Sequence, residues 1–260
     1  MSIFSINPLG IQLIVSVLIG IAAGFVGAFM VLRRMSLVGD ALSHVALPGI
    51  ALALIIHINP FLGAFATLVF GIFIIWLLEK RTALPSETLI GILFTLSLAI
   101  GILITPEPEL LEALFGDITK IGAGDVIITI IAVPLIIFLL ERIYKGLVLD
   151  VISRDMTRTM GISIHRINFI FLFLVAVIVT LGLKVAGTLL MGSLVIIPAA
   201  AAKNVSTSLK DYALLAGVFG AICAAVGILV ANYYGLSPGP IVVLTSGVLF
   251  LGTLLMKEGK

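Results

Sequence analysis

The chain has 260 residues, of which 61% are hydrophobic and only 11% are charged, about half the charged share of a typical soluble domain. The formal net charge of +2, with its basic residues scattered along the chain, excludes a nucleic-acid-binding protein, and the single Cys223 excludes a disulfide framework. The composition therefore predicts a membrane protein. No Gly-x-x-x-x-Gly-Lys-Ser/Thr phosphate loop occurs, so any ATP-driven work needs a second chain that hydrolyses the ATP.

Nine apolar segments approach the roughly 20 residues that a helix needs to cross a hydrocarbon core. Backbone groups in lipid must bond internally, and the segments lack the alternation of barrel strands, so we expect helices. The fold class predicted is an all-α, polytopic membrane helix bundle, with one transmembrane domain over residues 1–260 because no linker divides the chain. The segments run over about 11–32, 37–58, 61–78, 88–105, 126–140, 167–183, 185–202, 212–233 and 241–256.

The orientation of these segments follows from the basic residues. No positive charge precedes the first segment, so we interpret it as a mature span rather than a cleavable signal peptide. If the odd-numbered connections face the cytoplasm, that side collects thirteen of the 15 Lys and Arg residues, and the other side keeps Lys120 and Lys184. This asymmetry predicts an external N-terminus and a cytoplasmic C-terminus.

The second segment carries two ionisable side chains, Asp40 and His44. Positions i and i+4 share one face of a helix, with β-carbons about 5 to 6 Å apart. Measured from an interface near Arg34, a rise of 1.5 Å per residue places Asp40 about 9 Å and His44 about 15 Å into the core. A carboxylate at that depth is costly unless paired or hydrated, and transporters bind cargo there.

The chemistry of this pair suits a first-row divalent cation such as zinc, manganese or iron, which accept carboxylate oxygen and imidazole nitrogen. Pro48 lacks an N–H, so the carbonyl of His44 loses its helical hydrogen bond and the turn beside the pair is loosened. Two ligands are too few for one chain, but a symmetric dimer supplies four. An Asp–His hydrogen bond that merely ties helices together is the other interpretation of the spacing.

The remaining polar residues favour structural roles. His57 and His165 fit solvated positions at a segment end and in a cytoplasmic loop. Glu87 follows Ser86 where the first turn of a helix favours an acid. Lys184 either extends to the outer interface or faces a cavity, and the sequence does not separate these.

Two connections are long enough to have functions. The outer stretch 106–125 is acidic and predicts a short helix over 109–115, and the cytoplasmic stretch 146–166 is short, amphipathic and rich in arginine. The acidic residues of the outer stretch are Glu107, Glu109, Glu112, Asp117 and Asp125.

The apolar run 169–202 is interrupted by Gly182, Lys184 and Gly187. It therefore forms either two spans or one span and a re-entrant piece. The sequence thus predicts eight or nine transmembrane helices.

Residues 32–51, LRRMSLVGDALSHVALPGIA, resemble the signature of the zinc, manganese and iron ABC-transporter permeases, the membrane subunits of bacterial high-affinity metal importers. Further stretches fit that family in order, and the resemblance covers nearly the whole chain. Glu87 departs from it, since we expect Asp there in relatives. The further stretches are 86–91, 114–117, 180–190, 196–202 and 237–243.

The resemblance implies a homodimeric permease in the cytoplasmic membrane of a prokaryote, with a cytoplasmic ATPase subunit on each half and an external metal-binding protein that delivers cargo. Asp40 and His44 would contact the ion at the dimer axis. The cargo would be Zn²⁺, Mn²⁺ or Fe²⁺, and no permanently bound cofactor is implied.

Residues 152–162 resemble the family's coupling helix, which fits a groove on the ATPase. A basic interfacial helix resting on anionic membrane lipid is the alternative interpretation of this stretch. Gly161 suits a helix stop. The residues expected to contact the ATPase are Arg154, Asp155, Met156, Arg158 and Gly161.

Two other functions are alternatives to that of an importer permease. A stand-alone secondary transporter would exchange protons at Asp40 and His44 and would need no ATPase. An intramembrane hydrolase is disfavoured because no His-Glu-x-x-His or Gly-x-Ser-x-Gly motif occurs and Ser43 lies on a different helix face from His44. We therefore expect a permease and not an enzyme.

Overall fold

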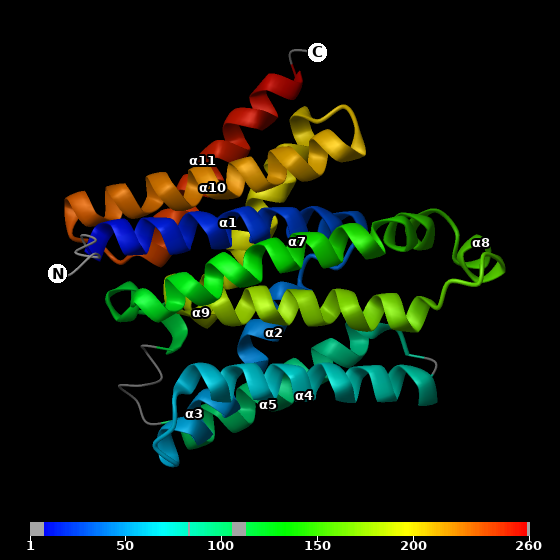
Figure 1. The fold of residues 1–260 in the computed structure, drawn as a ribbon, viewed down its shortest axis with the longest axis horizontal. Coiled ribbons are helices and arrows are strands. Elements are labelled where there is room, and N and C mark those ends of the chain that lie inside the picture. Colours follow the sequence, from blue (N-terminus) through cyan, green and yellow to red (C-terminus); the bar gives the residue numbers. More distant parts are fainter. Residues whose placement is uncertain (1–7, 83, 106–112, 259–260) are drawn as a thin grey trace.

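The computed structural model of the protein describes residues 8–82, 84–105 and 113–258, and within those ranges it contains helices and no strand (Figure 1). The predicted all-α class is confirmed. The elements are α1 (Pro8–Leu32), α2 (Val38–Val45), α3 (Leu47–Ile55), α4 (Pro60–Arg81), α5 (Ser86–Ile104), the 3-10 helix η1 (Ile118–Lys120), α7 (Ala123–Ile152), α8 (Arg154–Thr159), α9 (Ile164–Val205), α10 (Leu209–Tyr234) and α11 (Pro238–Glu258).

Eight segments in the described part of the chain are long and apolar enough to cross a membrane. α2 and α3 form one of them together, Val38–Ile55, and the first part of α9, Ile164–Thr188, forms another. Leu190–Val205 is a shorter apolar helix. The predicted choice between eight and nine is therefore resolved as eight full spans and one short helical piece.

The backbone of α9 breaks at Gly187, whose φ of +69° is a left-handed value. Before the break, α9 is antiparallel to α1, because Arg33 at the end of α1 reaches Asn168 while Ile19 lies beside Gly182. After the break the chain turns back, and its second part leads toward the loop before α10 (Figure 1). The interruption foreseen in the apolar run is thus a reversal.

A segment of the outer connection packs into this break. An added β-carbon at Gly187 would overlap the carbonyl oxygen of Leu114, and one at Gly116 would lie 2.7 Å from the amide nitrogen of Gly187. Gly116 also has a positive φ, +74°. Two left-handed glycines therefore let backbone meet backbone here. The helix predicted over 109–115 lies partly outside the described residues, and its described end, 113–115, is helical.

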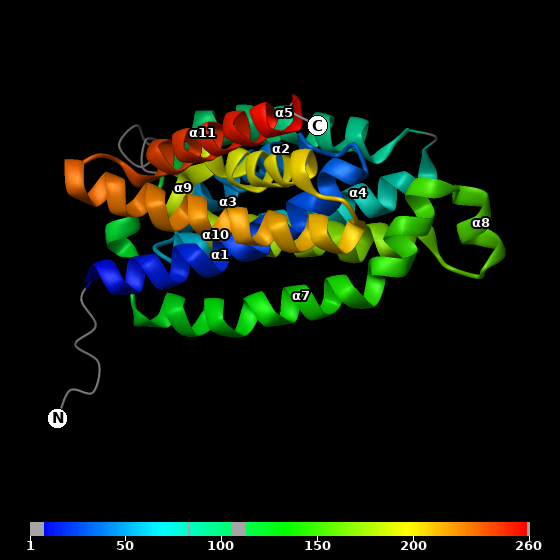
Figure 2. The same cartoon turned by 90° about the horizontal axis from the view of Figure 1, so that it is seen from above.

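The helices form two groups joined by α2. In Figure 1, α3, α4 and α5 lie together below α1, α7, α9, α10 and α11. α2 crosses between the groups, packing on α9 and on α5. Figure 2 shows α2, α5 and α11 toward the same side of the molecule.

The cytoplasmic connection is shorter than the sequence indicated. α7 continues to Ile152, so the beginning of the predicted stretch 146–166 is helical. Only residues 153–163, which include the six-residue helix α8, connect α7 to α9. α8 lies at the end of the molecule remote from the N-terminus (Figure 1).

Replacing Gly187 with alanine is expected to destabilise the fold. A non-glycine residue at a left-handed φ costs about 1–2 kcal/mol, and the overlap with Leu114 adds to that cost. Gly252 in α11 is the matched control, because an added β-carbon there meets nothing within 4 Å. Thermal unfolding of both purified variants in detergent checks the prediction, and equal midpoints would contradict it.

Candidate functional site

A tight reversal places Asp40 in the first turn of α2. α1 ends in a Schellman motif, in which the Met35 amide donates to the Met30 carbonyl at 2.8 Å and the Arg34 amide donates to the Val31 carbonyl at 3.2 Å. Arg34 takes the left-handed position of this motif, with φ +60°. The reversal therefore fixes where α2 begins, and the helix N-terminus favours the carboxylate.

The helix that carries the pair is interrupted just beyond His44. α2 ends at Val45 and α3 begins at Leu47, and the Ala46 amide donates to the Ser43 carbonyl at 3.3 Å, one residue closer than in an α-helix. The structure thus has the loosened turn that Pro48 predicts.

The second part of α9 fixes the position of α2. An added β-carbon at Gly192 would lie 2.7 Å from the β-carbon of Asp40, so only glycine lets the two backbones approach this closely. The Ser43 hydroxyl lies 2.5 Å from the Thr188 carbonyl oxygen and 2.7 Å from the Asp40 carbonyl oxygen, and it can donate to either. Ser43 therefore faces α9, on a different face from His44 as predicted.

The Asp40 side chain borders a cavity between α2 and α5. The cavity has a volume of about 330 Å³, and its lining includes Asp40, Arg34 and, from α5, Glu87 and Phe94. Asp40 is half-buried. The carboxylate is thus placed beside an accessible space inside a helix bundle.

His44 lies one turn further along α2 and is buried, with 7% of its surface exposed. Its ring packs at 5.3 Å, centroid to centroid, on the ring of Phe94. Its Nδ1 is buried without a hydrogen-bond partner among the described residues. The structure therefore contains no Asp40–His44 hydrogen bond within its described part, and the helix-tying interpretation of the pair is not supported.

Among the described residues, no third His, Cys, Asp or Glu side chain joins Asp40 and His44 in an arrangement that could hold a metal ion. Across residues 8–82, 84–105 and 113–258, no group of three or more His, Cys, Asp or Glu side chains is arranged to hold a metal ion. A four-coordinate site at Asp40 and His44 would need ligands from a second copy.

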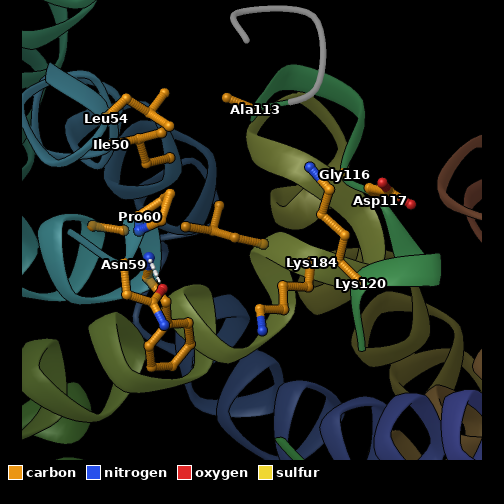
Figure 3. Close-up of a pocket in the computed structure, with 12 residues that line it drawn as sticks. Ile50, Leu54, Asn59, Pro60, Ala113, Gly116, Asp117, Lys120 and Lys184 are labelled. Carbon is orange, nitrogen blue, oxygen red and sulfur yellow. Dashed lines mark hydrogen bonds between the residues drawn. The ribbon is translucent and has the colours of Figure 1, made fainter. Parts of the chain in front are cut away.

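A second cavity lies on the outer side of the pair. It has a volume of about 480 Å³, and Figure 3 shows Ile50 and Asn59 on one side of it and Gly116 and Asp117 on the other. Ile50 is six positions beyond His44, about 9 Å along a helix axis. The residues between His44 and Ile50 are buried or half-buried. The candidate pair thus lies between two cavities.

Lys184 faces the outer cavity. Its Nζ lies 2.7 Å from the Asp125 Oδ1 and 5.8 Å from the centroid of the Phe61 ring. The other carboxylate oxygen of Asp125 accepts from the Gly122 amide at 2.8 Å, at the start of α7. The sequence left open whether Lys184 extends to the outer interface or faces a cavity. In the structure it faces the cavity and pairs with a carboxylate.

A third cavity lies at the end of the bundle that the charge asymmetry predicts to be cytoplasmic, with a volume of about 590 Å³. Its lining shares Arg34, Met35 and Glu87 with the cavity beside Asp40. Glu87 is in the first turn of α5, as predicted, and is exposed. The space beside Asp40 therefore borders the cytoplasmic cavity.

α8 carries the residues expected to contact an ATPase. Asp155 and Met156 are exposed, Arg154 and Arg158 belong to the same short helix, and Gly161 ends it with φ +74°. Thr157 is buried, and its hydroxyl donates to the Ser153 carbonyl four residues earlier at 2.9 Å, which stabilises the start of the helix. The predicted helix stop at Gly161 is confirmed.

The other histidines occupy structural positions. His57 takes the left-handed position of a second Schellman motif, with φ +54°, in which the Ile58 amide donates to the Ala53 carbonyl at 2.9 Å. His165 is half exposed, with its Nδ1 3.9 Å from a Glu79 carboxylate oxygen.

Sequence reasoning missed a buried polar cluster at the cytoplasmic ends of the helices. Arg33, counted there only as a cytoplasmic charge, is buried against Asp150 and Asn168. A usable signal was Asn168, the polar residue within the apolar stretch that begins α9. Its partners lie more than 80 positions away along the chain, so the sequence does not identify them.

Comparison with known proteins gives similarity over almost the whole chain. A profile of the ABC 3 transport family matches residues 7–257. The high-affinity zinc uptake system membrane protein ZnuB of Buchnera aphidicola subsp. Baizongia pistaciae is 35% identical over 248 residues, which cover 93% of this chain and 95% of that protein. The manganese import system permease protein ScaB of Streptococcus gordonii is 33% identical over 243 residues, which cover 92% of this chain and 87% of that protein.

A solved structure agrees with these relatives. PsaBC from Streptococcus pneumoniae in complex with Fab has a chain that superposes with a TM-score of 0.83 at 30% identity, covering 96% of this chain and 91% of that one. The similarity therefore extends to the three-dimensional arrangement, and the matched region includes Asp40, His44 and α8.

Proposed function

The chain belongs to the ABC 3 transport family, and we propose that it moves zinc or manganese ions as the permease subunit of an ATP-binding-cassette importer. It is a multi-pass protein of the bacterial inner membrane, and the ATPase of such an importer is a separate subunit. Support for the cargo comes from the relatives, which are a zinc uptake and a manganese import protein.

One observation carries the assignment of the ion site. The Nδ1 of His44 is buried and unpartnered within the described structure, one helical turn from the Asp40 carboxylate. A buried imidazole nitrogen without a partner is unfavourable unless a ligand satisfies it, and a divalent cation satisfies it. The ion is cargo, so binding must be weak enough for release.

The site would be completed by a second copy of the chain. We propose a homodimer in which the sides carrying α2, α5 and α11 face each other (Figure 2). α5 and α11 leave large apolar side chains exposed, including Leu96, Leu103, Leu244 and Val248. Two Asp40 and two His44 side chains around a two-fold axis give four ligands.

Transport would proceed by alternating access to this site. The outer cavity and the cavity beside Asp40 lie on opposite sides of His44, with buried residues between them. ATP-driven movement of the partner subunits acts on α8 and changes which cavity reaches the ion. A proton-coupled transporter would use the same pair without an ATPase, so dependence of uptake on ATP separates the two functions.

Replacing either candidate ligand should abolish transport. In proteoliposomes containing the complete importer and ATP, Asp40→Ala and His44→Ala are each expected to lower the uptake of radiolabelled zinc or manganese about 100-fold, because half of the ligands disappear in a symmetric site. The amount of assembled complex should not change.

His57→Asn is the matched control for this test. It removes a histidine just beyond the end of the same span, and asparagine tolerates the left-handed backbone at that position. Its uptake should stay within about twofold of the wild-type rate. Wild-type uptake by both ligand variants would contradict the site assignment.

Gly192→Ala tests the contact that positions Asp40. The added methyl group would lie 2.7 Å from the Asp40 β-carbon and must push α2 away from α9. We expect about tenfold weaker uptake, since small displacements of a binding group cost at least that much. Gly124→Ala in α7, where an added β-carbon meets nothing within 4 Å and which lies outside the proposed dimer interface, should transport normally. Equal uptake by the two variants would show that this contact does not set the site.

A further inference from the structure

A continuous set of polar side chains joins the cytoplasmic ends of five helices. The Arg33 Nη2 lies 2.9 Å from the Asp150 Oδ2, and the Arg33 Nη1 donates to the Asn168 Oδ1 at 3.1 Å. The Asn168 amide donates to the Glu79 Oε1 at 2.7 Å, and the Ser86 hydroxyl also donates to that oxygen. We call these five residues the cytoplasmic polar network. Arg33 directly follows α1, and Asp150, Asn168, Glu79 and Ser86 belong to α7, α9, α4 and α5, respectively.

The network is buried. The side chains of Arg33 and Asp150 are 8% and 5% exposed, the Glu79 side chain is 9% exposed, and Asn168 is 5% exposed. The Arg33 guanidinium also lies 5.3 Å from the centroid of the Phe171 ring. Burying such groups carries a large desolvation cost, and apolar residues would hold an apolar bundle together at least as well. A buried hydrogen-bonded network instead fixes one particular arrangement of the helix ends.

Both connections to α8 end in this network. Asp150 is four positions before the start of α8 at Arg154, near the end of α7. Asn168 is in the first turns of α9, which follows α8. A displacement of α8 that travels along the chain into α7 or α9 therefore passes Asp150 or Asn168.

The same network touches both walls of the cavity beside Asp40. Arg33 immediately precedes Arg34, which belongs to the reversal between α1 and α2 and lines that cavity. Ser86 immediately precedes Glu87, which lines it from α5. On the α2 side and on the α5 side of the cavity, a lining residue is thus the sequence neighbour of a network residue.

From these contacts we infer that the cytoplasmic polar network transmits the displacement of α8 to the two walls of the Asp40 cavity. Asn168 is the central positioning residue, because its side chain bonds both to Arg33 of the Arg33–Asp150 pair and to Glu79 and Ser86. The inference rests on the proposed function for the ATPase partner that moves α8. It does not depend on which ion is carried or on how the ion is bound.

The chain contains a natural reporter of this movement. Trp76 is the one tryptophan of the sequence and lies on α4, one turn before Glu79. Its ring packs at 5.9 Å on Phe169, the neighbour of Asn168, and the Lys80 Nζ lies 3.3 Å from its centroid. Rearrangement of the network must change the surroundings of this ring, and with them its fluorescence.

The experiment uses the complete importer, with an ATPase subunit whose tryptophans have been replaced. Trp76 fluorescence is compared without nucleotide and after trapping with ATP and vanadate. We expect a nucleotide-dependent difference in the wild type and its loss in Asn168→Ala. In proteoliposomes, the same variant should import about tenfold less metal per ATP hydrolysed, while ATP hydrolysis itself continues.

Asn204→Ala is the matched control, because Asn204 is also on α9 and also makes a side-chain hydrogen bond, to Thr253 at 3.3 Å, but lies outside the network. It should keep both the fluorescence difference and the import ratio. If Asn168→Ala fails to assemble, Arg33→Lys replaces it, since lysine keeps the charge opposite Asp150 but loses the fork that also reaches Asn168.

The outcomes separate this inference from the proposed function. A full fluorescence difference and a normal import ratio in an assembled network variant would overturn the inference. Asp40→Ala should keep the fluorescence difference while losing transport, because Asp40 is outside the network. Wild-type transport by Asp40→Ala and His44→Ala would instead overturn the ion site and leave the network assignment intact.

Discussion

The constraint on which this structure depends is that a polar group inside a bilayer must find a partner within the protein. Most polar side chains of the spans satisfy it simply. Thr180 donates to the carbonyl of Ala176, four residues earlier, and Lys184 pairs with Asp125. A few buried polar atoms of the described residues have no hydrogen-bond partner, including the hydroxyls of Ser16, Thr188 and Tyr212 and the Nδ1 of His44. Of these four groups, His44 has a carboxylate one helical turn away and lies between two cavities. The requirement that buried polar groups have partners therefore points to His44 as a position that packing alone does not explain.

The sequence predicted those features that depend on local chemistry. Apolar run lengths gave the helices, the four-residue spacing placed Asp40 and His44 on one face, and Pro48 predicted the interruption beside them. Gly161 was predicted as a helix stop and has the left-handed φ of one. Each of these follows from residues within a few positions of each other, where backbone geometry limits the outcomes.

The features that the sequence did not predict depend on distant partners. The glycine pattern around Gly187 did not decide between two spans and one span with a re-entrant piece. The reversal that the structure has there relies on packing against Gly116 of the outer connection. From the sequence, Arg33 was counted only as a charge on the cytoplasmic side. Its burial depends on Asp150 and Asn168, which lie 117 and 135 positions away along the chain. The extension of α7 to Ile152 was missed for a related reason, since its last turns follow the charged stretch 141–145 and pack through the buried Gly146 and Leu147.

The two interrupted helices meet at the candidate site, and their meeting explains why the interruptions are tolerated. α2–α3 breaks at Ala46 and α9 breaks at Gly187, and the Ser43 hydroxyl within 2.5 Å of the Thr188 carbonyl joins the two breaks. Each break frees backbone groups that an intact helix would bond, so each would be costly alone in lipid. Placed together, a side chain of α2 bonds a carbonyl at the break in α9, and α2 remains as an eight-residue helix bounded by a turn at both ends. A short helix held in this way presents Asp40 and His44 from a piece of backbone that is separate from the long spans around it.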